Sequence, residues 1–435
     1  MHARGLTVTC DSEAQRDAVE SFAYRIVRVT AGADAVLPAA DANPEVPLLQ
    51  LYAAALHLFA LTEDGDAAAD RYLAVATGLA PRMNAREAHL DAALRAWRRH
   101  DFSSAATALE ALTAIWPHDL LAAKLAEFLY YVLGQQHEGV RFLRHMERLV
   151  PHHADDPDLL SMLAFARELC GDVDGAQAAA RRALKIAPHT PWADHALSHV
   201  WLRRGAVEPA IAHLSAALPS WADSNRLIWS HNAWHLALHH LERLDLAAAK
   251  RLLADVIWRA DEDLGGIALD AIALQWRAEL ADLDSGADWR RLADRVAPRA
   301  AECFMPFVSA QVAYALARDG RGLPLDTLRD AVRAQAHRDT PDARRAWSHI
   351  GAAVVEAAIA AAQGDGARCA ALLEPIIAEV SIVGGSDAQC DVFRLMYARA
   401  LRDAGRRSDA RAYLTSMWGA VARTPLEARW RDRLA

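Results

Sequence analysis

The chain has 435 residues, of which 53% are hydrophobic and 24% charged, a balance typical of a folded protein rather than a disordered one. Its 48 basic and 56 acidic residues give a net charge of −8 without a long basic run, which argues against nucleic acid as a partner. The longest charge-free run, 46–62, is shorter than the ~20 apolar residues of a membrane-spanning helix, so we expect no membrane span.

Two further features bear on the compartment. Residues 1–17 become charged before any apolar stretch of signal-peptide length appears, so we expect no secretion signal in them. The five cysteines lie far apart and show no C-x-x-C spacing, which fits reduced thiols rather than disulfides. A cytoplasmic location is therefore the expectation.

The first part of the chain, residues 1–80, is expected to be a helical cap. Ser12 can cap a first helix, and Pro47 suits the first turn of a second. The segment 64–66, Asp-Gly-Asp, predicts a turn before the next helix. This region matches a repeat pattern poorly.

Residues 81–245 are expected to form regular helical repeats. Pro117, Pro151 and Pro188 each close a helix pair, and their separations (151 minus 117 is 34, 188 minus 151 is 37) are close to the ~34-residue tetratricopeptide period. Small residues fall where paired helices would cross, which lets the helices approach closely. In the best-matched unit these small residues are Ala164, Ala176 and Ala183.

Residues 246–435 are expected to continue as irregular helical repeats. A helix is predicted at about 267–283 and a loop at 282–288, and Ser386 with Gln389 has the S-x-x-Q spacing of a capping box. No run shows a convincing strand period. The sequence therefore predicts an all-α, right-handed tetratricopeptide-like helical solenoid that forms a single domain.

The first helix of each pair in such a solenoid lines the concave side, so its positions 5 and 9 should face a groove. Over four successive units these positions become rich in imidazole. They are Lys124, Phe128, Ser161, Phe165, His195, His199, His231 and His235.

Two histidine pairs dominate this predicted groove. His195 and His199 are four residues apart, as are His231 and His235, so each pair shares one face of its helix. The pairs are offset by one repeat, because 231 minus 195 and 235 minus 199 both give 36. We therefore expect four imidazoles to meet on one wall, with His239 continuing the second face.

Histidine is a common ligand of transition metals, so the four could hold a divalent ion such as zinc, iron or manganese. The H-E-x-x-H pattern of zinc enzymes is absent, because neither pair has a glutamate after its first histidine. The same residues would also suit a polar groove whose imidazoles bond one another or water, or acid–base catalysis without a metal. The residues alone leave these three alternatives open.

Other polar motifs have two interpretations each. Asp270 and Arg277 lie seven residues apart on one helical face and could bind a polar substrate or pair with neighbouring helices. The segment 384–386, Gly-Gly-Ser, could bind an anion or simply begin a helix. No nucleotide-binding motif and no G-x-S-x-G element occurs in a workable context, so no nucleotide cofactor is expected.

Five segments carry a resemblance to a known family. They are REAHLDAALRAW at residue 86, PHDLLAAKLAEFLYYVLG at 117, DHALSHVW at 194, SHNAWHLALHHLE at 230 and GGSDAQCDVF at 384. With them the chain resembles the tetratricopeptide repeat protein 38 family over nearly its whole length. Bacterial proteins similar to that family belong to natural-product pathways, toxoflavin-type azapteridine biosynthesis among them.

The resemblance implies a set of functional residues. The family pattern has matching histidines at all four positions, and it differs at Ser309 to Gln311, at Glu127 and at Cys390, which puts any catalytic role of those positions in doubt. The further residues that match the family pattern are Asn232, Trp234, Asp270, Arg277, Gln389 and Asp391.

Two functions compete. The favoured one is a small-molecule-binding protein, and an enzyme, that performs a redox or acid–base step on a small polar heteroaromatic substrate held in the concave groove. The alternative is a tetratricopeptide adaptor without catalysis, whose groove takes a protein partner or a second copy of the chain. Adaptors that clamp acidic peptide ends need lysine and arginine, whereas this groove offers histidine and aromatic residues. The expected catalytic residues are the four histidines, and the expected substrate-binding residues are Lys124, Phe128, Phe165, Asn232, Trp234, His239, Asp270, Arg277, Gln389 and Asp391.

Overall fold

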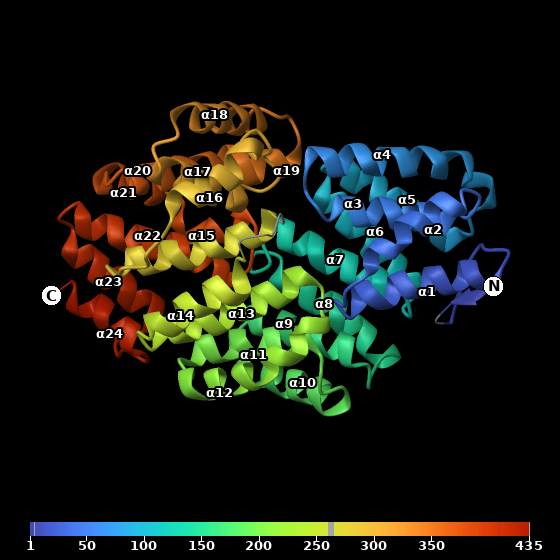
Figure 1. Cartoon of the computed structure of the whole chain (residues 1–435), viewed down its shortest axis with the longest axis horizontal. Helices are drawn as coiled ribbons and strands as arrows, with labels where there is room; N and C mark the ends of the chain where they lie inside the picture. Colours follow the sequence, from blue (N-terminus) through green and yellow to red (C-terminus); the bar gives the residue numbers. More distant parts are fainter. Residues whose placement is uncertain (4, 260–264, 435) are drawn as a thin grey trace. The chain divides into compact units, whose positions relative to one another are not determined.

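The computed structural model describes residues 1–3, 5–259 and 265–434, which fold almost wholly into helices (Figure 1). The strands among these residues are two short ones, β1 (His2–Ala3) and β2 (Leu6–Thr7), paired antiparallel. The all-α prediction is confirmed apart from this hairpin, whose two-residue strands are too short to show a period in the sequence. No helix in the described part combines the length and apolarity that a bilayer crossing requires.

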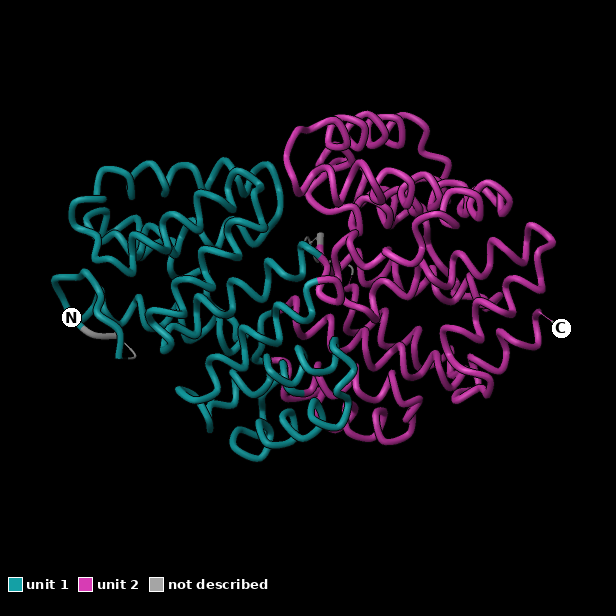
Figure 2. Tube along the Cα trace, turned by 180° about the vertical axis from the view of Figure 1, so that it is seen from behind, with its two compact units in different colours: residues 1–133, 138–193, 223–225 teal, residues 134–137, 194–222, 226–435 magenta. Residues whose placement is uncertain are grey.

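The chain divides into two compact units (Figure 2). Unit 1 comprises residues 1–133, 138–193 and 223–225, and unit 2 comprises 134–137, 194–222 and 226–435. The finer expectations, a single tetratricopeptide-like solenoid with divisions near residues 80 and 245, stay predictions.

Unit 1 shows the caps that the sequence predicts. Ser12 begins α1 with a capping box, in which its side chain accepts from the Gln15 N–H and the Gln15 side chain accepts in return. Pro47 stands in the first turn of α3, where its missing N–H leaves no bond unmade. The helices of unit 1 are α1 (Glu13–Val27), η1 (Ala33–Ala35), α2 (Val36–Ala42), α3 (Pro47–Leu58), α4 (Glu63–Gly78), η2 (Ala80–Arg82), α5 (Ala85–Arg98), α6 (Phe102–Ile115), α7 (Leu120–Leu133), α8 (Gly139–Leu149), η3 (Val150–His152), α9 (Pro157–Leu169) and α10 (Val173–Ile186).

The crossing of α9 and α10 is built as expected from small side chains. Ala164 on α9 and Ala176 and Ala183 on α10 are fully buried where the two helices pack together. A methyl group at these positions allows close approach of the helix backbones.

One expected turn is wrong. Residues 64–66, Asp-Gly-Asp, lie inside the first turn of α4, because the Thr62 hydroxyl caps the helix by accepting from the Gly65 N–H at 3.0 Å. Acidic side chains in a first turn are stabilised by the positive end of the helix dipole. The same residue types that favour turns therefore begin this helix.

In unit 2, α13 packs against α12, α14 and α15, and α15 packs in turn against α22. The expected loop 282–288 separates α15 from α16, and the expected capping box of Ser386 and Gln389 begins α22. The elements are α11 (Pro191–Arg204), whose first three residues belong to unit 1, α12 (Val207–Ala217), η4 (Leu218–Asp223), whose last residue belongs to unit 1, α13 (Arg226–Glu242), α14 (Leu246–Leu252), the π-helix η5 (Leu253–Ile257), α15 (Gly265–Leu280), α16 (Trp289–Val296), η6 (Ala297–Arg299), α17 (Pro306–Arg318), α18 (Gly322–Ala336), α19 (Pro341–Ala343), the π-helix η7 (Arg344–Gly351), α20 (Ala352–Ala362), α21 (Gly366–Leu373), η8 (Ile377–Val383), α22 (Asp387–Asp403), α23 (Arg407–Trp418) and α24 (Pro425–Asp432).

Candidate functional site

The four predicted histidines come together inside unit 2. His195 and His199 project from α11, and His231 and His235 project from α13. The four-residue spacing places both members of each pair on the face that meets the other helix. Ring centroids lie 4.7 Å apart for His195 and His199, 5.2 Å for His195 and His231, 4.9 Å for His195 and His235, 4.6 Å for His199 and His235, and 4.8 Å for His231 and His235.

This cluster is an interior feature rather than the wall of an open groove. His195 is 2% exposed, His199 1% and His235 0%, while the side chain of His231 keeps 18% of its surface. The spacing rule for groove positions assumes an open concave face, and it carries no information on how deeply neighbouring helices cover that face. The sequence therefore predicts that the imidazoles meet, and the structure adds that three of them are buried.

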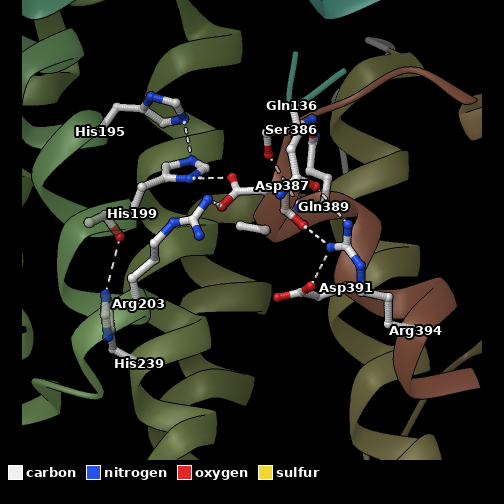
Figure 3. A network of polar contacts seen from close by, with 12 residues as sticks. Gln136, His195, His199, Arg203, His239, Ser386, Asp387, Gln389, Asp391 and Arg394 are labelled. Carbon is white, nitrogen blue, oxygen red and sulfur yellow. Dashed lines mark hydrogen bonds and ion pairs between the residues drawn. The ribbon is translucent and has the colours of Figure 1, made fainter. Parts of the chain in front are cut away.

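A chain of hydrogen bonds leads from α22 into the cluster (Figure 3). Nδ1 of His199 lies 2.9 Å from Oδ1 of Asp387, and Nε2 of His199 lies 3.3 Å from Nε2 of His195. The second oxygen of Asp387 accepts from the Arg203 guanidinium at 3.0 Å. Burial alone would raise the pKa of Asp387, but the His199 imidazole and the Arg203 guanidinium hold that pKa below its ordinary value.

A second carboxylate holds His231. Its Nδ1 lies 3.1 Å from Oδ1 of Asp270 on α15, and its ring stacks on the indole of Trp234 at a centroid distance of 5.1 Å. With the Nδ1 proton donated to the carboxylate, the lone pair of the neutral ring is on Nε2. Asp270 thus fixes the orientation and the tautomer of His231.

His235 stands apart chemically. Neither of its ring nitrogens has a hydrogen-bond partner among the described residues, although the side chain is fully buried. Burial, followed by the charges of the neighbouring imidazoles, holds the pKa of His235 well below its ordinary value. The ring is therefore neutral and carries one unshared lone pair.

One ring nitrogen from each of His195, His231 and His235 lies within 4.8 Å of the other two. Imidazole nitrogens gathered in this way can bind a transition metal or a polar ligand. These three residues are the best-placed metal ligands of the cluster.

The remaining predicted residues of unit 2 surround the cluster in contacts of their own. Nε2 of His239 lies 3.1 Å from the Ser198 hydroxyl, and burial lowers the pKa of His239 to about 3. Trp234 and Asn232 are buried on α13 beside the histidines. Whether these residues bind substrate stays a prediction.

Arg277 and the start of α22 form a further group. The Arg277 guanidinium donates to the carbonyls of Ala388 and Gln389, lies 5.2 Å from the Trp234 ring centroid, and has its pKa lowered to about 10 by burial. Arg277 does not pair with Asp270, which bonds His231 instead. The Gln389 side chain completes the helix cap, and Asp391 accepts from Arg394, which also donates to Gln136 (Figure 3).

Three of the expected substrate-binding residues belong to unit 1. Lys124 donates to Glu127 at 2.6 Å and lies 3.7 Å from the ring centroid of Trp192. Phe128 stacks on Trp97, and Phe165 is fully buried against Trp192 and Phe142. Lys124, Phe128 and Phe165 thus pack against side chains of their own unit.

Sequence reasoning missed Asp387 and Arg203. Asp387 lies within the segment GGSDAQCDVF, whose Gly-Gly-Ser start predicts either an anion site or a helix start and gives no role to Asp387 itself. The spacing of residues carries no signal for the contact between Asp387 and His199, because the two residues are 188 positions apart. No protein-family model matches the chain.

Proposed function

We propose that this chain is a small-molecule enzyme whose reaction centre is the buried histidine cluster of unit 2, rather than a peptide-binding adaptor. The observation that carries the proposal is the burial of the imidazoles. A bound peptide needs a surface groove along which its backbone can lie. Side chains that are 0–2% exposed can be reached only by a small molecule or an ion.

The chemistry of the cluster supports the same proposal. His199 is held by a carboxylate whose pKa is depressed, and His235 is a neutral base shielded from water. Preorganised imidazoles of this kind bind, orient and exchange protons with a polar ligand. A substrate with nitrogen or oxygen atoms in a planar ring would suit them, because Trp234 stacks beside His231.

We further propose that the reaction belongs to a bacterial small-molecule pathway, as the family resemblance implies. The azapteridine type named above is one such setting, and it is part of the proposal. The proposal also includes a cytoplasmic location and a reaction that uses no nucleotide cofactor.

The test is the capture of small molecules by the purified full-length chain. The protein is incubated with an extract of its native cells, freed of unbound material by size exclusion, denatured, and analysed by mass spectrometry. We expect wild type and His349→Ala to retain a common set of small molecules that His235→Ala loses. His349 is the matched control because its side chain is 56% exposed on unit 2.

Circular dichroism of all three proteins checks that the fold is retained. Equal retention by His235→Ala and wild type would move the binding site elsewhere. Retention of no small molecule, with a protein captured equally by all three, would favour the adaptor and overturn the proposal.

A further inference from the structure

We propose that His195, His231 and His235 form a three-imidazole site for a divalent transition-metal ion that favours nitrogen ligands, zinc or iron(II). The inference rests on the proposed function, because it names what the buried cluster uses for its chemistry. It can fail separately, since a metal-free cluster could still bind a small molecule.

The spacing of the three rings suits one ion. Two nitrogens bound to a tetrahedral zinc ion at about 2.0–2.1 Å lie about 3.3–3.4 Å from each other. One ring nitrogen of each of the three residues already lies within 4.8 Å of those of the other two. For one ion to bind all three, the nitrogens would have to come closer together through rotation of the rings about their side-chain bonds.

The hydrogen bonds around the cluster decide where each proton is. Asp387 accepts the Nδ1 proton of His199, so Nε2 of His199 carries a lone pair and accepts the Nε2 proton of His195 at 3.3 Å. This leaves the lone pair of His195 on Nδ1. Asp387 and His199 are thus positioning residues that set the tautomer of a metal ligand.

Asp270 does the same for His231 from a different helix. It takes the Nδ1 proton and leaves the lone pair on Nε2, the nitrogen at the far side of the ring. Two of the three proposed ligands are therefore oriented by chains that end in a carboxylate, the arrangement that metal-binding histidines commonly show.

His235 supplies the independent observation. A fully buried imidazole with two nitrogens that lack partners in the described residues is costly, since each loses its hydrogen bonds to water and gains none. A metal ion on one nitrogen offsets that cost. The other nitrogen, which carries the proton, then points away from the ion.

The donor set selects the ion. Imidazole nitrogen suits zinc and iron, whereas manganese prefers carboxylate and water oxygen. The thiol of Cys390 is not among the donors, because it is turned toward the Gly384 carbonyl, to which it donates at 3.3 Å. Three protein ligands also leave a coordination position open, as catalytic metal sites require.

The experiment is a titration of the chelator-treated full-length protein with Co²⁺, which reports its ligands through visible absorption, followed by competition with Zn²⁺ and Mn²⁺. We expect one tightly bound ion in wild type and His349→Ala, displaced by Zn²⁺ and not by Mn²⁺. His231→Ala and His235→Gln remove a ligand, so both should lose the Co²⁺ spectrum. At position 235 glutamine is used in place of alanine, because it keeps a polar side chain of similar size and so is more compatible with folding.

The positioning residues give a different pattern. Asp270→Asn and His199→Ala should bind Co²⁺ about 10–100-fold more weakly with an unchanged spectrum, because they alter the support of a ligand and not the ligand itself. Absence of Co²⁺ binding in folded wild type would overturn the inference. So would binding that His235→Gln leaves intact, or tighter binding of Mn²⁺ than of Zn²⁺. Retention of small molecules without metal would leave the proposed function standing.

Discussion

His199 and Asp387 are 188 residues apart in the sequence, yet the imidazole Nδ1 and the carboxylate Oδ1 lie 2.9 Å from each other inside unit 2. The contact ties α11 to the first residue of α22. Arg203, one turn beyond His199, holds the second oxygen of the same carboxylate. The Asp387 side chain thus links the start of α22 to the histidine cluster and to the Arg203 guanidinium.

Replacing Asp387 by asparagine should destabilise the chain at neutral pH. The folded-state pKa of Asp387 lies below its ordinary value of 3.8, so the ionised carboxylate contributes stability above that value and loses it as the pH falls through the folded pKa. We expect Asp387→Asn to lower the free energy of unfolding by about 1–3 kcal/mol at pH 7. The deficit should shrink in urea denaturation below pH 4.

Asp326→Asn is the control for that measurement, because its side chain is 70% exposed and it should change the free energy of unfolding very little. A deficit for Asp387→Asn that is equal at pH 7 and at low pH would contradict the ion pair as its cause.

The contribution of Glu242 to the free energy of unfolding should have the opposite dependence on pH. Burial raises the pKa of Glu242 from 4.5 to about 7, and the charge of Glu427 adds to this rise. The hydrogen bond from the Thr424 hydroxyl at 2.6 Å and the charge of Arg423 lower the pKa and offset part of the rise. Folding therefore loses stability as the pH rises from about 4.5 to about 7. Glu242→Gln should be more stable than wild type at pH 8, by about 1 kcal/mol because the side chain is only partly buried.

Thermal or urea denaturation at pH 5 and pH 8 measures this difference. Glu208→Gln, with a side chain 69% exposed on α12, is the matched control and should show no such dependence. A gain for Glu242→Gln at pH 5 as large as at pH 8 would count against the raised pKa.

His235 and His145 should respond in opposite ways to the same substitution. Both are buried, but Nε2 of His145 contacts the Thr113 hydroxyl at 2.8 Å and its Nδ1 contacts Tyr130 at 2.9 Å, whereas His235 has neither bond. In metal-free protein, His235→Leu should raise the free energy of unfolding by about 1 kcal/mol, and His145→Leu should lower it by about 1–3 kcal/mol. Urea denaturation in the presence of chelator compares them.

Destabilisation by both variants to the same extent would show that His235 has bonds that this account lacks. A gain in stability that accompanies loss of Co²⁺ binding would mark His235 as a residue kept for function at the expense of stability.

The sequence predicted the meeting of α11 and α13 because a repeat offset and a four-residue spacing are local patterns. It also predicted the caps at Ser12 and Ser386, whose signals lie within a few residues. The Asp387 contact has no such signal, since nothing in the spacing of residues reports which distant helix start will approach His199.

Two features depend on residues outside the pattern that predicts them. Asp-Gly-Asp at 64–66 suits a turn and a helix start equally well, and Thr62 before it decided the outcome. The depth of the histidine cluster was likewise decided by neighbours, because α15 and α22 supply residues that contact its rings. Local residue types allow more than one local structure, and contacts with neighbouring residues determine which one forms.

X-ray absorption at the metal edge of the zinc-loaded full-length chain tests the central claim most directly. We predict a first coordination shell dominated by imidazole nitrogen at about 2.0–2.1 Å, with the imidazole signal lost in His235→Gln. A shell dominated by sulfur at about 2.3 Å, or an imidazole signal that His235→Gln leaves unchanged, would contradict the account.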